Sequence, residues 1–264
     1  MGADIHEAAR GFSRVSDAYV RGRPTYPAEA IALLARELRL GPGRVVLDLA
    51  AGTGKLTALL VGTGAEVVAV EPVAEMRAAL REALPDVQAF DGTAERMPLA
   101  AESVDAVTVA QAFHWFRGQE ALVEIHRVLR PGGVLGLVWN VRDDSVPRGL
   151  TEILEPLRGS APRYRTGSWR QAFAETGLFG SLRHAGFSHV QRLSHDAVVA
   201  RVASVSFVAS LPRAEHDAVL AEVRDLLQRD PGTRGRSEVE LPHRTEVYWC
   251  ERLPGASRPA GERP

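Results

Sequence analysis

The chain has 264 residues and a mass of 28.6 kDa, enough for one α/β domain with a small appended subdomain but not for two large independent domains. Hydrophobic residues make up 45% and charged residues 25%, so disordered, collagen-like and disulfide-rich classes are excluded. A formal net charge of −1 does not favour nucleic-acid partners, and the lack of a long apolar run does not favour a membrane. The single cysteine cannot form a disulfide within the chain. The first residues lack the apolar stretch of a signal peptide, so we expect a cytoplasmic protein that acts on small molecules.

From residue 44 onward, short β-branched runs alternate with amphipathic segments, which is typical of a parallel sheet covered by helices. The pattern predicts strands over residues 45–49, 67–70, 87–90, 104–110 and 134–139, and later over 245–250. It predicts helices over residues 55–61, 72–84 and 214–227. A further predicted helix includes residues 122–129 and is ended by Pro131-Gly132-Gly133.

Residues 141–185 interrupt this alternation with helical fragments, proline and glycine breaks, aromatic residues and arginines. Two interpretations are open: a mobile substrate lid over the edge of the sheet, or a loop without defined structure. With the lid, the expected organisation is a cofactor-binding core with an N-terminal cover (1–140), the lid (141–185), strands and a helix that complete the same domain (186–253), and a flexible tail (254–264).

A glycine-containing turn, Asp48-Leu49-Ala50-Ala51-Gly52-Thr53-Gly54, joins the first predicted strand to the first predicted helix. At such a position the backbone can come close to a nucleotide. A P-loop is excluded, because Leu56 follows Gly54-Lys55 and Leu49 stands where the leading glycine is required. Thr57, in place of a third glycine, weakens a nicotinamide-dinucleotide site without excluding it.

Glu71 follows the second predicted strand, 17 residues after Gly54. A carboxylate there can accept hydrogen bonds from both hydroxyls of a ribose, which nicotinamide and adenosyl cofactors share. The alternative is an ordinary acid favoured by the dipole at a helix N-terminus.

Six segments of the chain together resemble class I S-adenosylmethionine-dependent methyltransferases, in particular the small-molecule group around trans-aconitate methyltransferases. In the family order they are FSRVSDAYVRGRPTYP (12–27), VLDLAAGTGKLT (46–57), VAVEPVAEM (68–76), GTAERMPL (92–99), SVDAVTVAQAFHWF (103–116) and VLRPGG (128–133). The resemblance implies a Rossmann-like, mostly parallel seven-stranded sheet with helices on both faces, an N-terminal helical cover and a helical lid insertion. Ala50 and Thr93 depart from the family pattern, which often has glycine and aspartate there.

The resemblance also implies S-adenosyl-L-methionine as the cofactor. The turn with Asp48 would hold its methionine end, Glu71 its ribose and residues 93–95 its adenine, with Gln111 beneath the sulfonium and the segment of Tyr19 and Arg23 as a cover. The expected cofactor-binding residues are Tyr19, Arg23, Asp48, Ala50, Gly52, Gly54, Glu71, Pro72, Met76, Thr93, Ala94, Glu95 and Gln111.

The aromatic run after the fourth predicted strand, residues 111–116, is the best candidate for the acceptor side. The expected acceptor contacts are Phe113, His114, Trp115, Trp139, Asn140, Trp169 and Arg170. His114 is the candidate general base for a hydroxyl acceptor, or else a histidine that only packs beside a helix cap. Arg163, Arg165 and Arg170, with the aromatic residues among them, either bind an anionic acceptor or form a solvated face. The remaining histidines have no ligand spacing, so we expect no metal.

The expected reaction is in-line methyl transfer to a small-molecule acceptor, at a carboxylate or hydroxyl oxygen, driven mainly by positioning. Two alternatives are open: a nicotinamide-dependent oxidoreductase, which the lack of a Tyr-x-x-x-Lys pair disfavours because Lys55 is the only lysine, and a non-catalytic adenosyl-binding regulatory module. The pattern defines neither the acceptor nor the oligomeric state.

Overall fold

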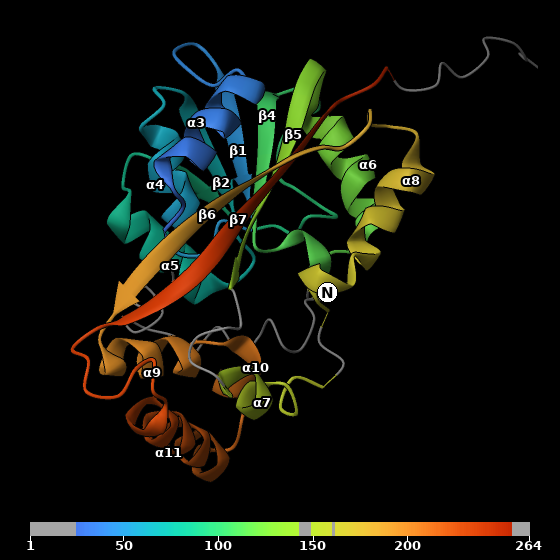
Figure 1. The fold of residues 1–264 in the computed structure, drawn as a ribbon. Coiled ribbons are helices and arrows are strands. Elements are labelled where there is room, and N and C mark those ends of the chain that lie inside the picture. The colour runs from blue at the N-terminus through green and yellow to red at the C-terminus, as the bar shows by residue number, and fades with distance from the viewer. Residues whose placement is uncertain (1–24, 143–148, 160–161, 255–264) are drawn as a thin grey trace, which may run out of the picture.

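The computed structural model describes residues 25–142, 149–159 and 162–254, which contain one seven-stranded sheet (Figure 1). Its strand order is β3-β2-β1-β4-β5-β7-β6. Strands β1 to β5 run parallel, and β7 is antiparallel to both of its neighbours. The strands are β1 Val45–Leu49, β2 Glu66–Val70, β3 Gln88–Phe90, β4 Val104–Ala110, β5 Leu129–Arg142, β6 Arg183–Leu193 and β7 Val239–Glu251. The expected mostly parallel, seven-stranded sheet is confirmed.

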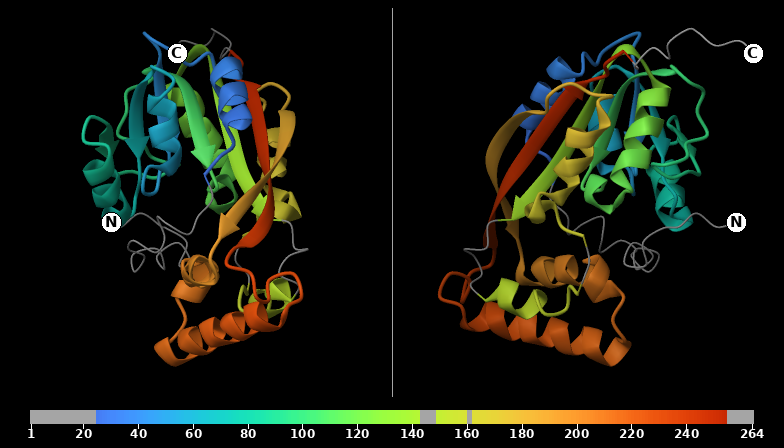
Figure 2. Two further views of the ribbon diagram at one scale, coloured as in Figure 1. Left: turned by 60° about the vertical axis from the view of Figure 1, so that its left-hand side comes forward. Right: turned by 90° about the vertical axis from the view of Figure 1, so that its right-hand side faces the viewer.

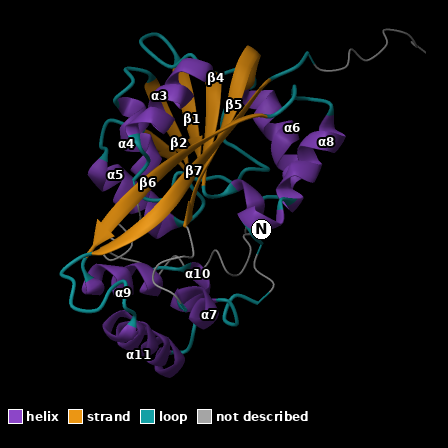
Figure 3. Ribbon diagram, viewed as in Figure 1, coloured by secondary structure: helices purple, strands orange, loops and turns teal. Residues whose placement is uncertain are grey.

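The sheet is covered on both faces by helices (Figure 3). Its central strands are therefore buried on both sides and appear in the sequence as continuous apolar runs rather than as an alternation. Leu34, Leu60 and Leu80 of α3, α4 and α5 pack on one face, and Leu122 and Ile125 of α6 pack on the other together with α8. These helices are α3 Ala28–Glu37, α4 Lys55–Val61, α5 Ala74–Ala83, α6 Gly118–Val128 and α8 Gln171–Thr176.

The fifth strand is longer than the sequence predicted. Helix α6 ends at Val128, and Pro131-Gly132-Gly133, expected to end it, instead lies inside β5. The pairing of β4 with β5 shifts register at this point, between Val104 and Ala106, and Gly132 has a φ of 74°. Such an irregularity lets proline and glycine enter a strand.

Four of the described helices form a cap beyond the carboxyl ends of the parallel strands (Figures 1 and 2). They have a hydrophobic core of their own, to which Leu150, Val199, Phe207 and Val223 each contribute from a different helix. The start of β7 supplies Val239 to the same core. We call these helices the helical cap: α7 Leu150–Leu154, α9 His195–Ala203, α10 Ser206–Ala209 and α11 Arg213–Arg229.

Residues 141–185 pack in two places, and the expected substrate lid stays a prediction. Helix α7 belongs to the cap, whereas Trp169 and Phe179 are buried in the core against the sheet. The span 186–253 supplies α9 to α11 to the cap as well as strands to the sheet. The proline and glycine breaks mark short helices that pack on different partners, which local patterns do not reveal.

Candidate functional site

The turn between β1 and α4 adopts left-handed backbone conformations at three residues: Ala50 has a φ of 57°, Gly52 of 59° and Gly54 of 85°. A Cβ at Gly54 would lie 3.1 Å from Leu80 Cγ, so this position also needs glycine for its close approach to α5. Ala50 keeps the same backbone despite its Cβ, which explains how the chain tolerates a departure from the expected glycine.

Replacing Ala50 by glycine is expected to stabilise the fold by about 1 kcal/mol, because the left-handed conformation is costly for alanine. A gain of this size raises the melting temperature by roughly 2–4 °C, which calorimetry can measure. Ala51→Gly is the matched control and should lose stability, because Ala51 is not left-handed. Equal changes in melting temperature for the two substitutions would show that the left-handed conformation of Ala50 is not strained.

Asp48 lies at the end of β1, fully buried. Its carboxylate accepts a hydrogen bond of 2.6 Å from the Thr57 hydroxyl in the first turn of α4, and the Thr108 hydroxyl of β4 lies 3.4 Å away. Burial raises the pKa of Asp48 to about 7, although both hydroxyls act in the opposite direction. Asp48 thus connects β1 to the first turn of α4 and stabilises the turn between them.

Asp48→Asn is expected to flatten the dependence of stability on pH. Because the pKa of Asp48 is raised on folding, its stabilising contribution is complete below about pH 4 and is lost as the pH rises towards about 7. Asparagine can still accept from Thr57 but does not titrate. Denaturant unfolding of both proteins between about pH 4 and pH 8 measures the difference, and parallel curves would exclude a titrating Asp48.

Glu71 directly follows β2 and is only 4% exposed. Its Oε2 accepts a hydrogen bond of 2.8 Å from the N–H of Gly52, and its Oε1 accepts one of 2.9 Å from the N–H of Val73. Burial raises its pKa, and the two N–H groups and Arg77 oppose the shift. A carboxylate has about four acceptor sites, so two remain for hydroxyl groups of a ligand.

The other expected cofactor residues lie in several parts of the fold. Met76 is buried, with its sulfur 3.9 Å from a Cβ placed on Gly52. Pro72 is half-buried between β2 and α5. Thr93 exchanges two backbone hydrogen bonds of 3.1 Å with Arg96 in a tight turn, Ala94 is buried, and Glu95 accepts a hydrogen bond from the N–H of Arg117. Tyr19 and Arg23 lie outside the described residues.

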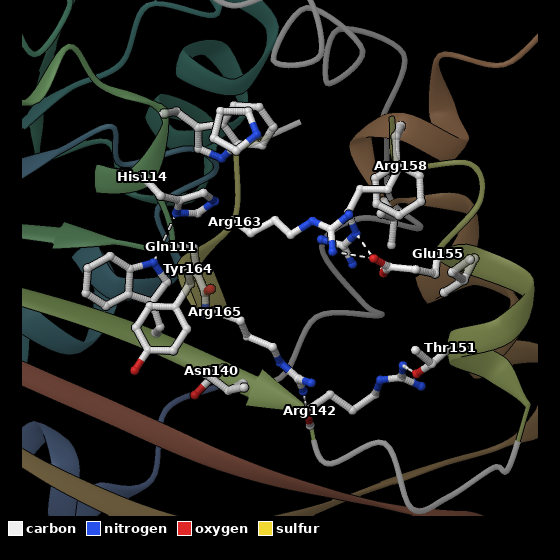
Figure 4. Close-up of a pocket in the computed structure, with 17 residues that line it drawn as sticks. Gln111, His114, Asn140, Arg142, Thr151, Glu155, Arg158, Arg163, Tyr164 and Arg165 are labelled. Carbon is white, nitrogen blue, oxygen red and sulfur yellow. Dashed lines mark hydrogen bonds and ion pairs between the residues drawn. The ribbon is translucent and has the colours of Figure 1, made fainter. Parts of the chain in front are cut away.

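A cavity of about 490 Å³ lies between the carboxyl ends of β4 and β5 and the helical cap (Figure 4). We call it the β4–β5 cavity. On the sheet side it begins at Gln111, which has a φ of 61° and whose N–H donates to the carbonyl of Val138. The lining residues are Gln111, His114, Trp115, Trp139, Asn140, Val141, Arg142, Thr151, Leu154, Glu155, Arg158, Pro162, Arg163, Tyr164, Arg165, Val205 and Phe207.

His114 and Trp139 are joined inside this cavity. The indole N–H of Trp139 donates a hydrogen bond of 3.2 Å to Nδ1 of His114. The Trp139 ring also packs against Tyr164, with ring centres 4.8 Å apart. Because an indole can only donate, Nδ1 must be the acceptor, and the neutral imidazole carries its proton on Nε2.

Three of the expected acceptor contacts do not line the cavity. Phe113 is 1% exposed and packs edge-on to Trp169, which is itself in the core against the sheet. Arg170 donates a hydrogen bond of 2.6 Å to the Tyr248 hydroxyl and lies over the Trp169 ring. The rings of Phe113 and Trp169 are buried in the core instead of facing the cavity, and Trp169 packs against Trp139, with ring centres 4.7 Å apart.

Sequence reasoning missed the contribution of the cap to the cavity. Thr151, Glu155 and Arg158 line it, together with Phe207 from a segment 49 residues further along the chain than Arg158. Helix α7 ends at Leu154, so Glu155 and Arg158 reach the cavity from the turns after it, and no local pattern marks them.

Two negative findings complete the site. Within residues 25–142, 149–159 and 162–254, no three His, Cys, Asp or Glu side chains gather as metal ligands. In the same part of the chain, no helix combines the length and the apolar character needed to cross a bilayer.

Comparisons with known proteins agree on one family. Residues 47–137 match a family model described as a methyltransferase domain. An uncharacterized methyltransferase of Mycobacterium tuberculosis is 42% identical over 251 residues, which cover 93% of this chain and 97% of the relative. A methyltransferase-like protein of Schizosaccharomyces pombe is 36% identical over 239 residues, or 89% and 93% of the two chains. The solved structure of a type II methyltransferase candidate from Anaeromyxobacter dehalogenans superposes with a TM-score of 0.66 at 27% identity and covers 88% of this chain and 99% of that one.

Proposed function

Since the chain belongs to the S-adenosylmethionine-dependent methyltransferases, we propose that it methylates an oxygen atom of a small-molecule acceptor bound in the β4–β5 cavity. Family membership sets aside the nicotinamide-dependent and non-catalytic alternatives, and the trans-aconitate-like subgroup stays a prediction. The observation that carries the proposal is the cavity itself. Its volume lies in the range of small-ligand sites, and it starts at Gln111, the residue expected beneath the sulfonium.

The residues at the ends of β1 and β2 fit the cofactor. Gly52 leaves open space, since a Cβ there would meet only Met76 within 4 Å, and Glu71 supplies an acceptor at the distance along the chain expected for ribose. When bound, S-adenosylmethionine supplies an electrophilic methyl group. The hydrogen bond between Thr57 and Asp48 links α4 to β1 on either side of the turn, and Gln111, expected beneath the sulfonium, lines the β4–β5 cavity.

The bond between Trp139 and His114 favours a carboxylate over a hydroxyl as the acceptor. A hydroxyl needs a base to remove its proton, and a base there contributes about 10²–10⁴ in rate. His114 is held with its basic nitrogen already accepting from Trp139, so in this arrangement it is a hydrogen-bond donor through Nε2. A carboxylate needs no base, and positioning can supply roughly 7–11 kcal/mol of the barrier.

The test is transfer of a radiolabelled methyl group to a panel of small carboxylic acids, phenols and alcohols. We expect a labelled product that releases methanol in alkali, as a methyl ester does. An alkali-stable product whose NMR spectrum places the methyl group on oxygen would identify an ether and hence a hydroxyl acceptor. Label found only on protein or nucleic acid would overturn the small-molecule acceptor.

A further inference from the structure

Four arginines line the β4–β5 cavity, and the side chains of Arg142 and Arg163 extend towards Thr151 and Glu155 on its cap side (Figure 4). We call Arg142, Arg158, Arg163 and Arg165 the arginine wall. Arg142 comes from the end of β5, Arg158 from the segment after α7, and the other two from the short 3₁₀ helix Tyr164–Thr166 and the residue before it. Four guanidinium groups from three parts of the chain thus meet in one small cavity.

The arginine wall is held in place by specific contacts. Arg142 donates a hydrogen bond of 2.9 Å to the Thr151 hydroxyl, and Arg165 donates to the backbone carbonyl of Arg142. Glu155 forms ion pairs with Arg163 and, at 3.5 Å, with Arg158. Among the lining residues that the structure describes, Glu155 is the one acid beside four arginines, so these residues carry a net formal charge of +3.

The opposite side of the cavity differs in chemistry. It is formed by Gln111, His114, Trp139 and Asn140, at the ends of the strands where the methyl group is expected. Guanidinium groups bind carboxylate and phosphate through paired hydrogen bonds, and a low-dielectric cavity strengthens the attraction. An acceptor that spans the cavity therefore meets neutral groups at one end and positive charge at the other.

We infer that the acceptor carries a second anionic group, a carboxylate or a phosphate, which is not methylated and which the arginine wall binds. This inference rests on the proposed function, since it assigns the class of acceptor to the same cavity. It also gives different roles to the three arginines of residues 163–170. Arg163 and Arg165 line the cavity and would bind the acceptor, whereas Arg170 donates a hydrogen bond to the Tyr248 hydroxyl.

The experiment measures binding by calorimetry in the presence of saturating S-adenosylhomocysteine. The probes are glutarate and phosphoglycolate, each with two acidic groups, and glutaramate, in which an amide replaces one carboxylate of glutarate. We expect at least one diacid to bind about ten- to a hundredfold more tightly than glutaramate, the usual effect of one charge-assisted hydrogen bond. Preference for glutarate or for phosphoglycolate identifies the anionic group.

Arg165→Gln should remove this preference while leaving the affinity for S-adenosylhomocysteine unchanged. Arg213→Gln is the matched control, because it removes the same charge from a cap side chain that is 96% exposed and outside the cavity. Equal binding of the diacids and glutaramate, no binding of either diacid, or an equal effect of the two variants would overturn the inference. Methyl transfer to an acceptor without a second anionic group would also overturn the inference, but it would leave the proposed function intact.

Discussion

Replacing Glu71 by glutamine is expected to weaken binding of S-adenosylmethionine by about ten- to a hundredfold. The carboxylate accepts from the N–H groups of Gly52 and Val73 and has two further acceptor sites for the ribose. A glutamine amide turns one acceptor oxygen into a donor, so at least one hydrogen bond to a charged group is lost, worth roughly 1.5–3 kcal/mol. Calorimetric titration with S-adenosylmethionine and S-adenosylhomocysteine measures the loss.

Glu75→Gln separates the ribose role from the helix-dipole alternative. Glu75 is exposed in the first turn of α5, so the substitution removes the same charge beside the same helix N-terminus. It should change cofactor affinity less than threefold, since the dipole interaction is worth roughly 0.3–1 kcal/mol for stability and is not made to the ligand. If both variants bind the cofactor alike, Glu71 is only a helix-terminal acid.

Trp139→Ala is expected to lower the free energy of unfolding by about 3–5 kcal/mol. The indole is 1% exposed, and its ring centre lies 4.7 Å from that of Trp169 and 4.8 Å from that of Tyr164. Removal leaves a cavity between β5 and the segment that follows the cap helix α7. Denaturant unfolding measures the loss, and Trp115→Ala, at a half-buried position of the same cavity, should cost clearly less.

Trp139→Phe isolates the contact with His114. Phenylalanine fills most of the space but has no N–H, so Nδ1 of His114 is released and the proton is no longer confined to Nε2. Nitrogen NMR of the labelled histidine should show a mixture of tautomers in this variant and one tautomer in the parent. One unchanged tautomer in both proteins would show that Trp139 does not set the state of His114.

Much of the cofactor side could be predicted because each of its features is local. The bounds of β1, α4 and β4 agree with the predicted ranges, since each is a short run of one periodicity, and Gly62 and Gln111 directly follow α4 and β4. Spacing placed Glu71 after β2, where its carboxylate reaches the Gly52 turn. Chain order alone brings these residues together, because neighbouring parallel strands end at the same edge of the sheet.

Strand β6 was harder to predict because it is an edge strand. Residues 183–193 alternate between exposed and half-buried and include glycine, serine and two histidines, so no apolar run marks them. Its structure depends on pairing with β7, about 55 residues later, which satisfies the backbone hydrogen bonds that the segment cannot satisfy alone.

The sequence by itself determined the parallel part of the sheet, the glycine turn and Glu71 beside that turn, because these depend on periodicity and on spacing within a few tens of residues. Only the tertiary structure decided which aromatic rings and arginines form the β4–β5 cavity. Tyr164 and Arg165 line the β4–β5 cavity. Trp169 and Arg170, only five residues further along the chain, do not line it. That choice depends on the partners that each side chain meets, Tyr248 of β7 for Arg170 and the carbonyl of Arg142 at the end of β5 for Arg165, and those partners come from segments that only folding brings close.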